Sequence, residues 1–106
     1  PNIQLPMVQT DYAENIYWVF GIVLGSKHKL NAAMAIKKLG QRGIGCRPFF
    51  CPMHQQPVLT DMGLFSGESY PVAESLYDRG FYIPSGLGLT VSEIHQVAKI
   101  VREILL

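Results

Sequence analysis

The sequence contains little charge. Asp, Glu, Lys and Arg make up only 16% of its 106 residues, whereas apolar residues reach 48%. An ordinary soluble domain has about one quarter charged residues. Nine basic and eight acidic residues leave a net charge of +1, which gives no electrostatic reason to expect nucleic acid or an anionic membrane as a partner. A domain with this composition is expected to have either an apolar face that something else covers or a large core of its own.

Long hydrophobic runs are also missing. The longest, residues 16–24, is far shorter than the about 20 residues that a membrane-spanning helix needs. Residues 1–6 have neither the basic region nor the apolar stretch of a signal peptide. The chain starts without Met, in an extended segment bounded by Pro1 and Pro6, so we expect this start to be a domain boundary. These features predict a cytoplasmic protein.

Cysteine is scarce, and the common catalytic motifs do not occur. Cys46 and Cys51 are expected to be free thiols in a chain without secretory signals. With His54 they have the spacing Cys-x4-Cys-x2-His, but a zinc site needs a fourth ligand, and an extended segment points positions 46 and 51 to opposite faces. The sequence contains no Gly-x-Ser-x-Gly, Walker or Gly-x-Gly-x-x-Gly motif. We expect no metal site and no self-sufficient catalytic constellation.

The residues that are present predict a small α+β domain. Residues 16–24 combine aromatic and β-branched side chains, which predicts a strand buried on both faces, with Gly21 marking a close approach or a bulge. Residues 30–42 contain good helix formers, and Gly43 is a helix stop. The remaining expected elements are a second strand at 44–50, a loop at 53–69, a helix at 70–79 and a short strand at 81–83.

The last helix has the clearest signal. Thr90 and Glu93 match a Thr-x-x-Glu capping box, and apolar residues then recur at helical spacing as far as Leu105. The order of elements predicts a two-layer sandwich, in which about three helices pack on a short and mostly antiparallel sheet. We expect one domain over residues 1–106, with residues 1–14 as an extended lead-in segment.

Residues 43–57 form the chemically unusual segment. His54 can donate, accept or carry charge near neutral pH, and Arg47 offers a fork suited to phosphate or carboxylate. Phe49, Phe50 and Met53 supply apolar walls of the kind that line ligand pockets. Each residue also has an ordinary structural explanation. The two phenylalanines can belong to the core, and His54 can be a hydrogen-bonded loop residue. Arg47 can form an ion pair with an acidic residue in the following loop.

Six short segments occur in a fixed order along nearly the whole chain. They are Asn15-Ile16-Tyr17-Trp18, Leu39-Gly40-Gln41-Arg42-Gly43-Ile44, Arg47-Pro48-Phe49-Phe50 with Pro52-Met53-His54, Tyr70-Pro71-Val72-Ala73-Glu74, Ile83-Pro84-Ser85 and Leu89-Thr90. In this order they resemble the C-terminal small domain of the DegT/DnrJ/StrS family of sugar aminotransferases, which have the fold-type-I aminotransferase architecture.

This resemblance implies amino transfer from glutamate to a nucleotide-linked keto sugar by means of pyridoxal phosphate. The segments around Trp18 and residues 47–54 are most similar to the perosamine-forming branch, which acts on GDP-4-keto-6-deoxymannose. In such enzymes a large N-terminal domain, absent here, supplies the Schiff-base lysine and most cofactor contacts. None of the five lysines of this chain falls in that lysine motif. We therefore expect the chain alone to contain no catalytic residue, bind no cofactor and be inactive.

The resemblance also implies partners and site residues. The expected partners are the large N-terminal domain of the same protein, a second subunit in a homodimer and the nucleotide-linked keto sugar. Among the site residues, His54 is the candidate for a substrate contact, Phe49, Phe50 and Met53 are candidates for the pocket wall, and Arg47 is a support or a phosphate contact. The alternative is a stand-alone α+β module that binds a ligand or a protein without catalysis.

Overall fold

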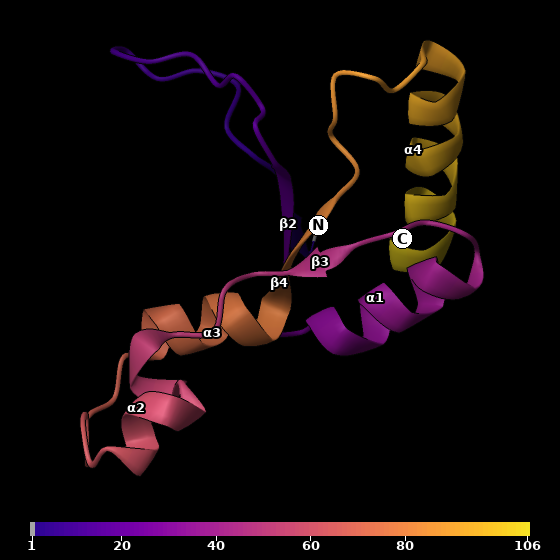
Figure 1. Ribbon diagram of the computed structural model, residues 1–106. Helices are drawn as coiled ribbons and strands as arrows, with labels where there is room; N and C mark the ends of the chain where they lie inside the picture. Colours follow the sequence, from indigo (N-terminus) through magenta and orange to yellow (C-terminus); the bar gives the residue numbers. More distant parts are fainter. Residues whose placement is uncertain (1) are drawn as a thin grey trace.

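Four antiparallel strands form the centre of the structure (Figure 1). The computed structural model describes residues 2–106. The strands lie in the order β1–β2–β4–β3, and every neighbouring pair is antiparallel. The elements are β1 (Ile3–Gln4), β2 (Phe20–Leu24), α1 (Ala32–Gln41), β3 (Arg47–Pro48), the 3-10 helix η1 (Met53–Gln55), α2 (Pro57–Asp61), α3 (Pro71–Arg79), β4 (Gly80–Ile83) and α4 (Val91–Leu105). The predicted small α+β fold is confirmed.

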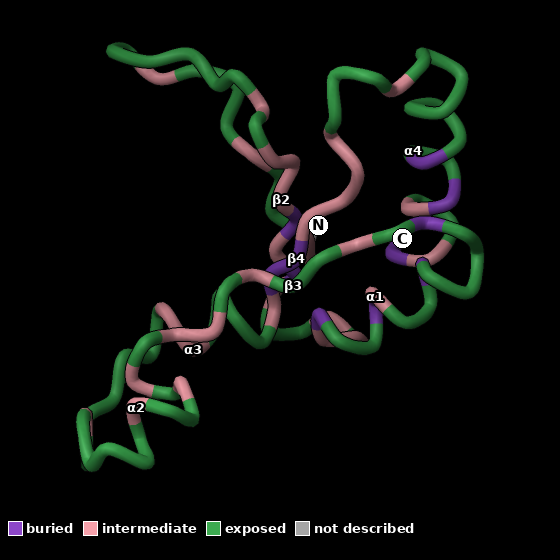
Figure 2. The backbone as a smooth tube through the Cα atoms, viewed as in Figure 1, coloured by how far each residue is buried: buried purple, intermediate pink, exposed green. Residues whose placement is uncertain are grey.

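The hydrophobic core lies between one face of this sheet and two helices. Side chains from β2 and β4 meet side chains from α1 and α4, and Figure 2 shows the buried segments gathered where these four elements converge. Phe81 is completely buried at the centre. The other buried residues of the core are Ile22, Leu24, Ala32, Ala35, Leu39, Ile44, Val97, Ile100 and Leu105.

Strand β2 is buried on one face only, so the prediction of a strand at 16–24 buried on both faces is wrong. Ile22 and Leu24 point into the core, while Val23, between them, is only half-buried. The strand also starts later than expected, because Tyr17 has a φ of 50°, a left-handed conformation that ends extended pairing. Ile16 therefore remains 88% exposed.

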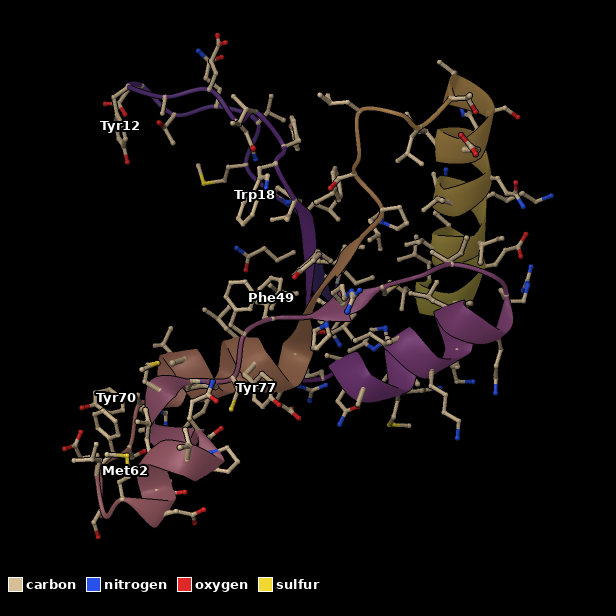
Figure 3. All side chains as sticks on the ribbon, viewed as in Figure 1. Tyr12, Trp18, Phe49, Met62, Tyr70 and Tyr77 are labelled. Carbon is tan, nitrogen blue, oxygen red and sulfur yellow. The ribbon has the colours of Figure 1, made fainter. Side chains whose placement is uncertain are left out.

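The N-terminal segment, for which the sequence predicts an extended lead-in, contains strand β1 and a short arm. Residues 7–15 form a short hairpin arm, in which Gln9 bridges Glu14 and the amide of Asn15 donates to the carbonyl of Val8 at 3.0 Å. The arm projects away from the sheet, with Tyr12 at its tip (Figure 3). The radius of gyration is 15.7 Å, larger than the about 13 Å of a compact chain of this length.

Two further expectations need correction. The predicted strand at 44–50 is reduced to Arg47 and Pro48, because Pro48 has no N–H to extend the ladder. The predicted loop at 53–69 contains η1 and the short helix α2, which Pro57 starts at its first position. Pro57 is a loop signal in the sequence, but proline is also favoured at the first position of a helix, which is the position that it occupies here.

The longer helices begin and end where the sequence indicates. Asn31 caps α1 by accepting from the amide of Met34 at 3.0 Å, and Gly43 follows the helix with a φ of 81°. Both hydrogen bonds of the Thr90–Glu93 capping box are present at the start of α4. In the part of the chain that the structure describes, no helix is long and apolar enough to cross a membrane.

Arg79, at the end of α3, fastens the loop between β2 and α1. Its guanidinium donates to the carbonyl oxygens of Ser26 at 2.9 Å, His28 at 3.3 Å and Leu30 at 2.8 Å. The Nε2 of His28 lies 3.1 Å from the carbonyl oxygen of Leu105, at the end of α4. One arginine and one histidine thus tie α3, the loop and α4 together around the core.

Replacing Arg79 by methionine should lower the free energy of unfolding by about 2 kcal/mol, because three carbonyls lose a charged donor while the aliphatic volume is retained. Arg79→Lys should recover little of the loss, since an ammonium group does not reproduce the fork. Urea denaturation is the measurement. Lys37→Met, at an exposed position of α1, is the control and should change stability by less than about 0.5 kcal/mol. Equal losses in the two methionine variants would contradict the role of Arg79.

Candidate functional site

The second face of the sheet is built around the ring of Phe49. Phe49 lies against Gly21 of β2 and Gly80 of β4, and a Cβ atom added at Gly21 would be 3.1 Å from the ring. At Gly80 a Cβ would collide with the ring and would be 2.5 Å from the carbonyl oxygen of Leu76. Two neighbouring strands therefore lack side chains where the ring lies. Gly21 does mark a close approach, as predicted from its place in a strand.

Two shallow hollows open side by side on this face, with Trp18, Val19 and Phe49 lining both. One, of about 400 Å³, also borders the base of the arm. The other, of about 320 Å³, extends to α3 and is lined by Trp18, Val19, Phe49, Phe50, Pro52, Ala73, Leu76, Tyr77 and Tyr82. Trp18, Phe49 and Tyr77 follow one another along this side of the sheet in Figure 3. We call the residues that line the two hollows the open face.

The open face is apolar and contains no charged lining residue. Trp18 is 77% exposed and Phe50 is 78% exposed. Large aromatic side chains are normally covered in a soluble protein, so an uncharged surface of this kind marks a place where another molecule or domain binds. It also accounts for the low charge content of the sequence.

Several residues of this face were not identified as site residues from the sequence. The expected strand at 16–24 would bury Trp18, and the expected helix at 70–79 and strand at 81–83 assign no site role to Leu76, Tyr77 or Tyr82. The left-handed backbone of Tyr17 puts Trp18 outside the strand, and no simple sequence pattern predicts such a conformation for tyrosine. Alternation along β4 could have indicated Tyr82, because it follows the buried Phe81.

His54 lies in η1 and interacts with α3. Its Nε2 is 2.8 Å from Oε1 of Glu74, and its ring is 4.9 Å from the ring of Tyr70. The side chain is 7% exposed. The fold therefore supplies the partner that His54 lacked in the sequence, and it joins two of the six segments of the family resemblance.

Glu74 is held by several donors at the start of α3. The backbone amide of Tyr70 donates to Oε1 at 2.9 Å, and the hydroxyl of Ser69 lies 3.4 Å from the same atom. The hydrogen bond from the Tyr70 amide, followed by that from His54, lowers the pKa of the Glu74 carboxyl below its ordinary value. A carboxylate in the first turn of a helix also interacts favourably with the helix dipole.

The other predicted site residues are placed separately. Phe49 and Phe50 line the same hollow, whereas Met53 is exposed on η1. Arg47 is exposed on the edge strand β3, in register with Tyr82 and on the same side of the sheet, but it lines neither hollow. The alternative explanation of Arg47 was an ion pair with an acidic residue of the following loop; among the described residues no ion pair of Arg47 occurs.

The five lysines of the chain, Lys27, Lys29, Lys37, Lys38 and Lys99, are all exposed. Residues 2–106 also bring together no group of three or more His, Cys, Asp or Glu that could hold a metal ion. Cys46 packs against the core, where burial raises the pKa of its thiol.

Comparison with known proteins identifies the family. Residues 1–102 match the profile of the DegT/DnrJ/EryC1/StrS aminotransferase family. The chain is 28% identical over 91 residues to GDP-perosamine synthase of Caulobacter vibrioides, covering 86% of this chain and 24% of that protein. It is 24% identical over 86 residues to GDP-perosamine synthase of Vibrio cholerae, covering 81% and 23%. The chain belongs to the DegT/DnrJ/EryC1/StrS aminotransferase family.

Solved structures show the same fold. The aminotransferase TlmJ of Streptoalloteichus hindustanus superposes with a TM-score of 0.78 at 18% identity, over 98% of this chain and 26% of the other. This likeness confirms the α+β fold that the family resemblance implied. The chain spans about a quarter of the length of the relatives that it matches.

Gly80→Ala should destabilise the chain by about 3 kcal/mol, because its methyl group meets both the Phe49 ring and the Leu76 carbonyl. Chemical denaturation measures the loss. Gly40→Ala is the matched control, since nothing lies within 4 Å of the added Cβ; it should be neutral or stabilising by up to about 1 kcal/mol, as expected for alanine in a helix. A Gly80→Ala chain as stable as the parent would rule out the close packing of Phe49.

Stability should fall in acid, in part because of Glu74 and Glu93. Hydrogen bonds from the Thr90 amide and hydroxyl lower the pKa of Glu93, as those from Tyr70 and His54 do for Glu74. Each carboxyl has a lower pKa in the folded chain than in the unfolded chain. Its ionised form therefore stabilises the fold at pH values above the ordinary glutamate pKa, and this stabilisation is lost as the pH falls through the pKa of the folded chain. Denaturation midpoints down to about pH 3 should therefore decline less steeply in Glu74→Gln and in Glu93→Gln. Curves parallel to that of the parent chain would contradict this prediction.

Proposed function

We propose that the chain is the small C-terminal domain of a pyridoxal-phosphate-dependent nucleotide-sugar aminotransferase. The reaction of the complete protein transfers an amino group from glutamate to a 4-keto-6-deoxy sugar nucleotide of the perosamine type. The observation that carries this proposal is the family match over residues 1–102. The likeness to two GDP-perosamine synthases supports GDP-4-keto-6-deoxymannose as the substrate. The free thiols Cys46 and Cys51 suit a cytoplasmic enzyme.

The open face is the surface that packs on the large N-terminal domain of the same protein. Its aromatic residues are exposed in this chain and its lining lacks charge, as expected of a surface buried in an interdomain contact. The relatives are about four times as long as the matched region, so they contain the additional chain that such a contact needs. The exposed apolar residues of the arm continue this surface outward, toward the second subunit of a homodimer.

The chain contributes walls and contacts to the sugar pocket. Phe50 and Met53, both exposed, contact the sugar, and Phe49 supports Phe50 from the sheet. Arg47, free of ion pairs among the described residues and on the same face, binds phosphate oxygens with its guanidinium fork. His54 makes one hydrogen bond to the sugar. The lysine that holds pyridoxal phosphate, and the chemistry of the cofactor, belong to the large domain.

A stand-alone ligand-binding module is the second candidate. The observation that favours it is the hollow of about 320 Å³ lined by aromatic side chains, because stacked aromatic walls bind flat or apolar ligands without help from another domain. Saturable binding of a nucleotide sugar by the isolated chain would favour this candidate over a domain that works only within a larger enzyme.

The test is an assay of the complete polypeptide with pyridoxal phosphate, glutamate and GDP-4-keto-6-deoxymannose. We expect an amino sugar nucleotide, detected by mass spectrometry, and 2-oxoglutarate in equal amount. The isolated chain, titrated with pyridoxal phosphate, should give no Schiff-base absorbance and serves as the control. Formation of an amino sugar only from another nucleotide-linked keto sugar would remove the perosamine assignment. No amino sugar from any keto sugar nucleotide would overturn the function.

A further inference from the structure

His54 and Glu74, which are 20 residues apart in the sequence, are brought together from η1 and α3. His54 belongs to η1 and Glu74 to α3, so the contact between them depends on how these two elements pack. The ring of Tyr70 lies 4.9 Å from the imidazole and is inclined to it by 60°. At 7% exposure, the ring of His54 is a fixed group whose two nitrogen atoms have different surroundings.

The Nε2 atom of His54 must act as a donor. Glu74 has a lowered pKa and accepts at Oε1 from His54, from the Tyr70 amide and from the hydroxyl of Ser69. An ionised carboxylate has no hydrogen to donate, so the 2.8 Å contact requires a hydrogen on Nε2. The ring nitrogen that bonds to the fixed partner determines which tautomer is present.

The other nitrogen, Nδ1, remains available. Among residues 2–106, no hydrogen bond of Nδ1 occurs, and no buried side-chain nitrogen or oxygen in this part of the chain lacks a partner. Nδ1 is therefore in contact with solvent. In the neutral ring, with hydrogen on Nε2, this atom is an acceptor.

We propose that Glu74 is a positioning residue that holds His54 with hydrogen on Nε2, so that Nδ1 is presented as an acceptor to a hydroxyl group of the sugar. This inference rests on the proposed function, since it assigns a role to His54 in sugar binding. Glu74 itself touches no substrate. Without it the ring would divide between two tautomers, only one of which offers an acceptor at Nδ1.

The structure provides variants that separate positioning from stability. Glu74→Gln keeps the shape and an oxygen acceptor for Nε2–H, whereas Glu74→Leu removes the acceptor. Glu93→Leu is the matched control, because it removes a carboxylate that accepts two hydrogen bonds at the first turn of α4, with no contact to His54. Any effect of lower stability alone should then appear in both leucine variants.

The first measurement reads the tautomer directly. In the 106-residue chain labelled with ¹⁵N-histidine, long-range ¹H–¹⁵N spectra at a pH where His54 is neutral should show hydrogen on Nε2 and an unprotonated Nδ1. Glu74→Gln should give the same pattern, and Glu74→Leu should give averaged shifts from both tautomers. Unchanged spectra in Glu74→Leu would overturn the proposal.

The second measurement uses the complete aminotransferase with pyridoxal phosphate. In Glu74→Leu, KM for the keto sugar nucleotide should rise about tenfold, the effect of one hydrogen bond, with KM for glutamate unchanged and kcat within about threefold. Glu74→Gln should recover most of the affinity, and Glu93→Leu should leave both KM values unchanged.

The outcomes separate the two proposals. An active parent enzyme whose sugar KM is the same in Glu74→Leu would overturn the positioning role alone and leave the function intact. A parent enzyme inactive with every keto sugar nucleotide would overturn the proposed function, and the sugar contact of His54 would fall with it. An equal rise of KM in both leucine variants would reduce the His54–Glu74 pair to a structural contact.

Discussion

The fit of one phenylalanine ring between two glycines shapes the working surface of this domain. Phe49 lies where Gly21 and Gly80 leave neighbouring strands without side chains, so the short edge strand β3 is held against the sheet by packing as well as by its few hydrogen bonds. The chain continues from there through Phe50 and Pro52 to η1. The position of the ring thus determines both the aromatic floor of the open face and the place at which His54 reaches Glu74. A side chain at Gly80 would disturb all of these at once.

The two faces of the sheet have different roles. Helices α1 and α4 cover one face, where the buried residues gather (Figure 2). Arg79 of α3 donates to the loop between β2 and α1, and His28 of that loop contacts the carbonyl oxygen of Leu105 in α4. The two hollows on the other face are open, and their lining is largely apolar and contains no charged residue. The chain belongs to an aminotransferase family and spans about a quarter of the relatives that it matches, and the interdomain contact that we propose would bury the exposed rings. The composition of the sequence is the first sign of this arrangement, since a domain with a covered face needs fewer charges.

Local signals predicted the helices well and the site only in part. The Thr90–Glu93 capping box and the Asn31 cap with Gly43 act within a few residues, and the structure contains them where the sequence indicates. The strand limits were missed because the left-handed conformation of Tyr17 contradicts its local preference. Helix α2 was missed because proline both breaks and begins helices. The pair of His54 and Glu74 depends on how η1 and α3 pack, which no spacing in the sequence reveals. Family resemblance identified His54 as a candidate, but only the fold identified its partner.

The most direct test of the central claim uses Trp18, the single tryptophan of the chain, which lines both hollows of the open face. The chain is labelled with 5-fluorotryptophan and its ¹⁹F resonance is recorded in H₂O and in D₂O, alone and after addition of the unlabelled remainder of the aminotransferase. Covering of the open face predicts a solvent isotope shift in the isolated chain that disappears in the complex, with a change in chemical shift. A complex that forms with the isotope shift of Trp18 unchanged would show that the large domain binds elsewhere, and would contradict the account.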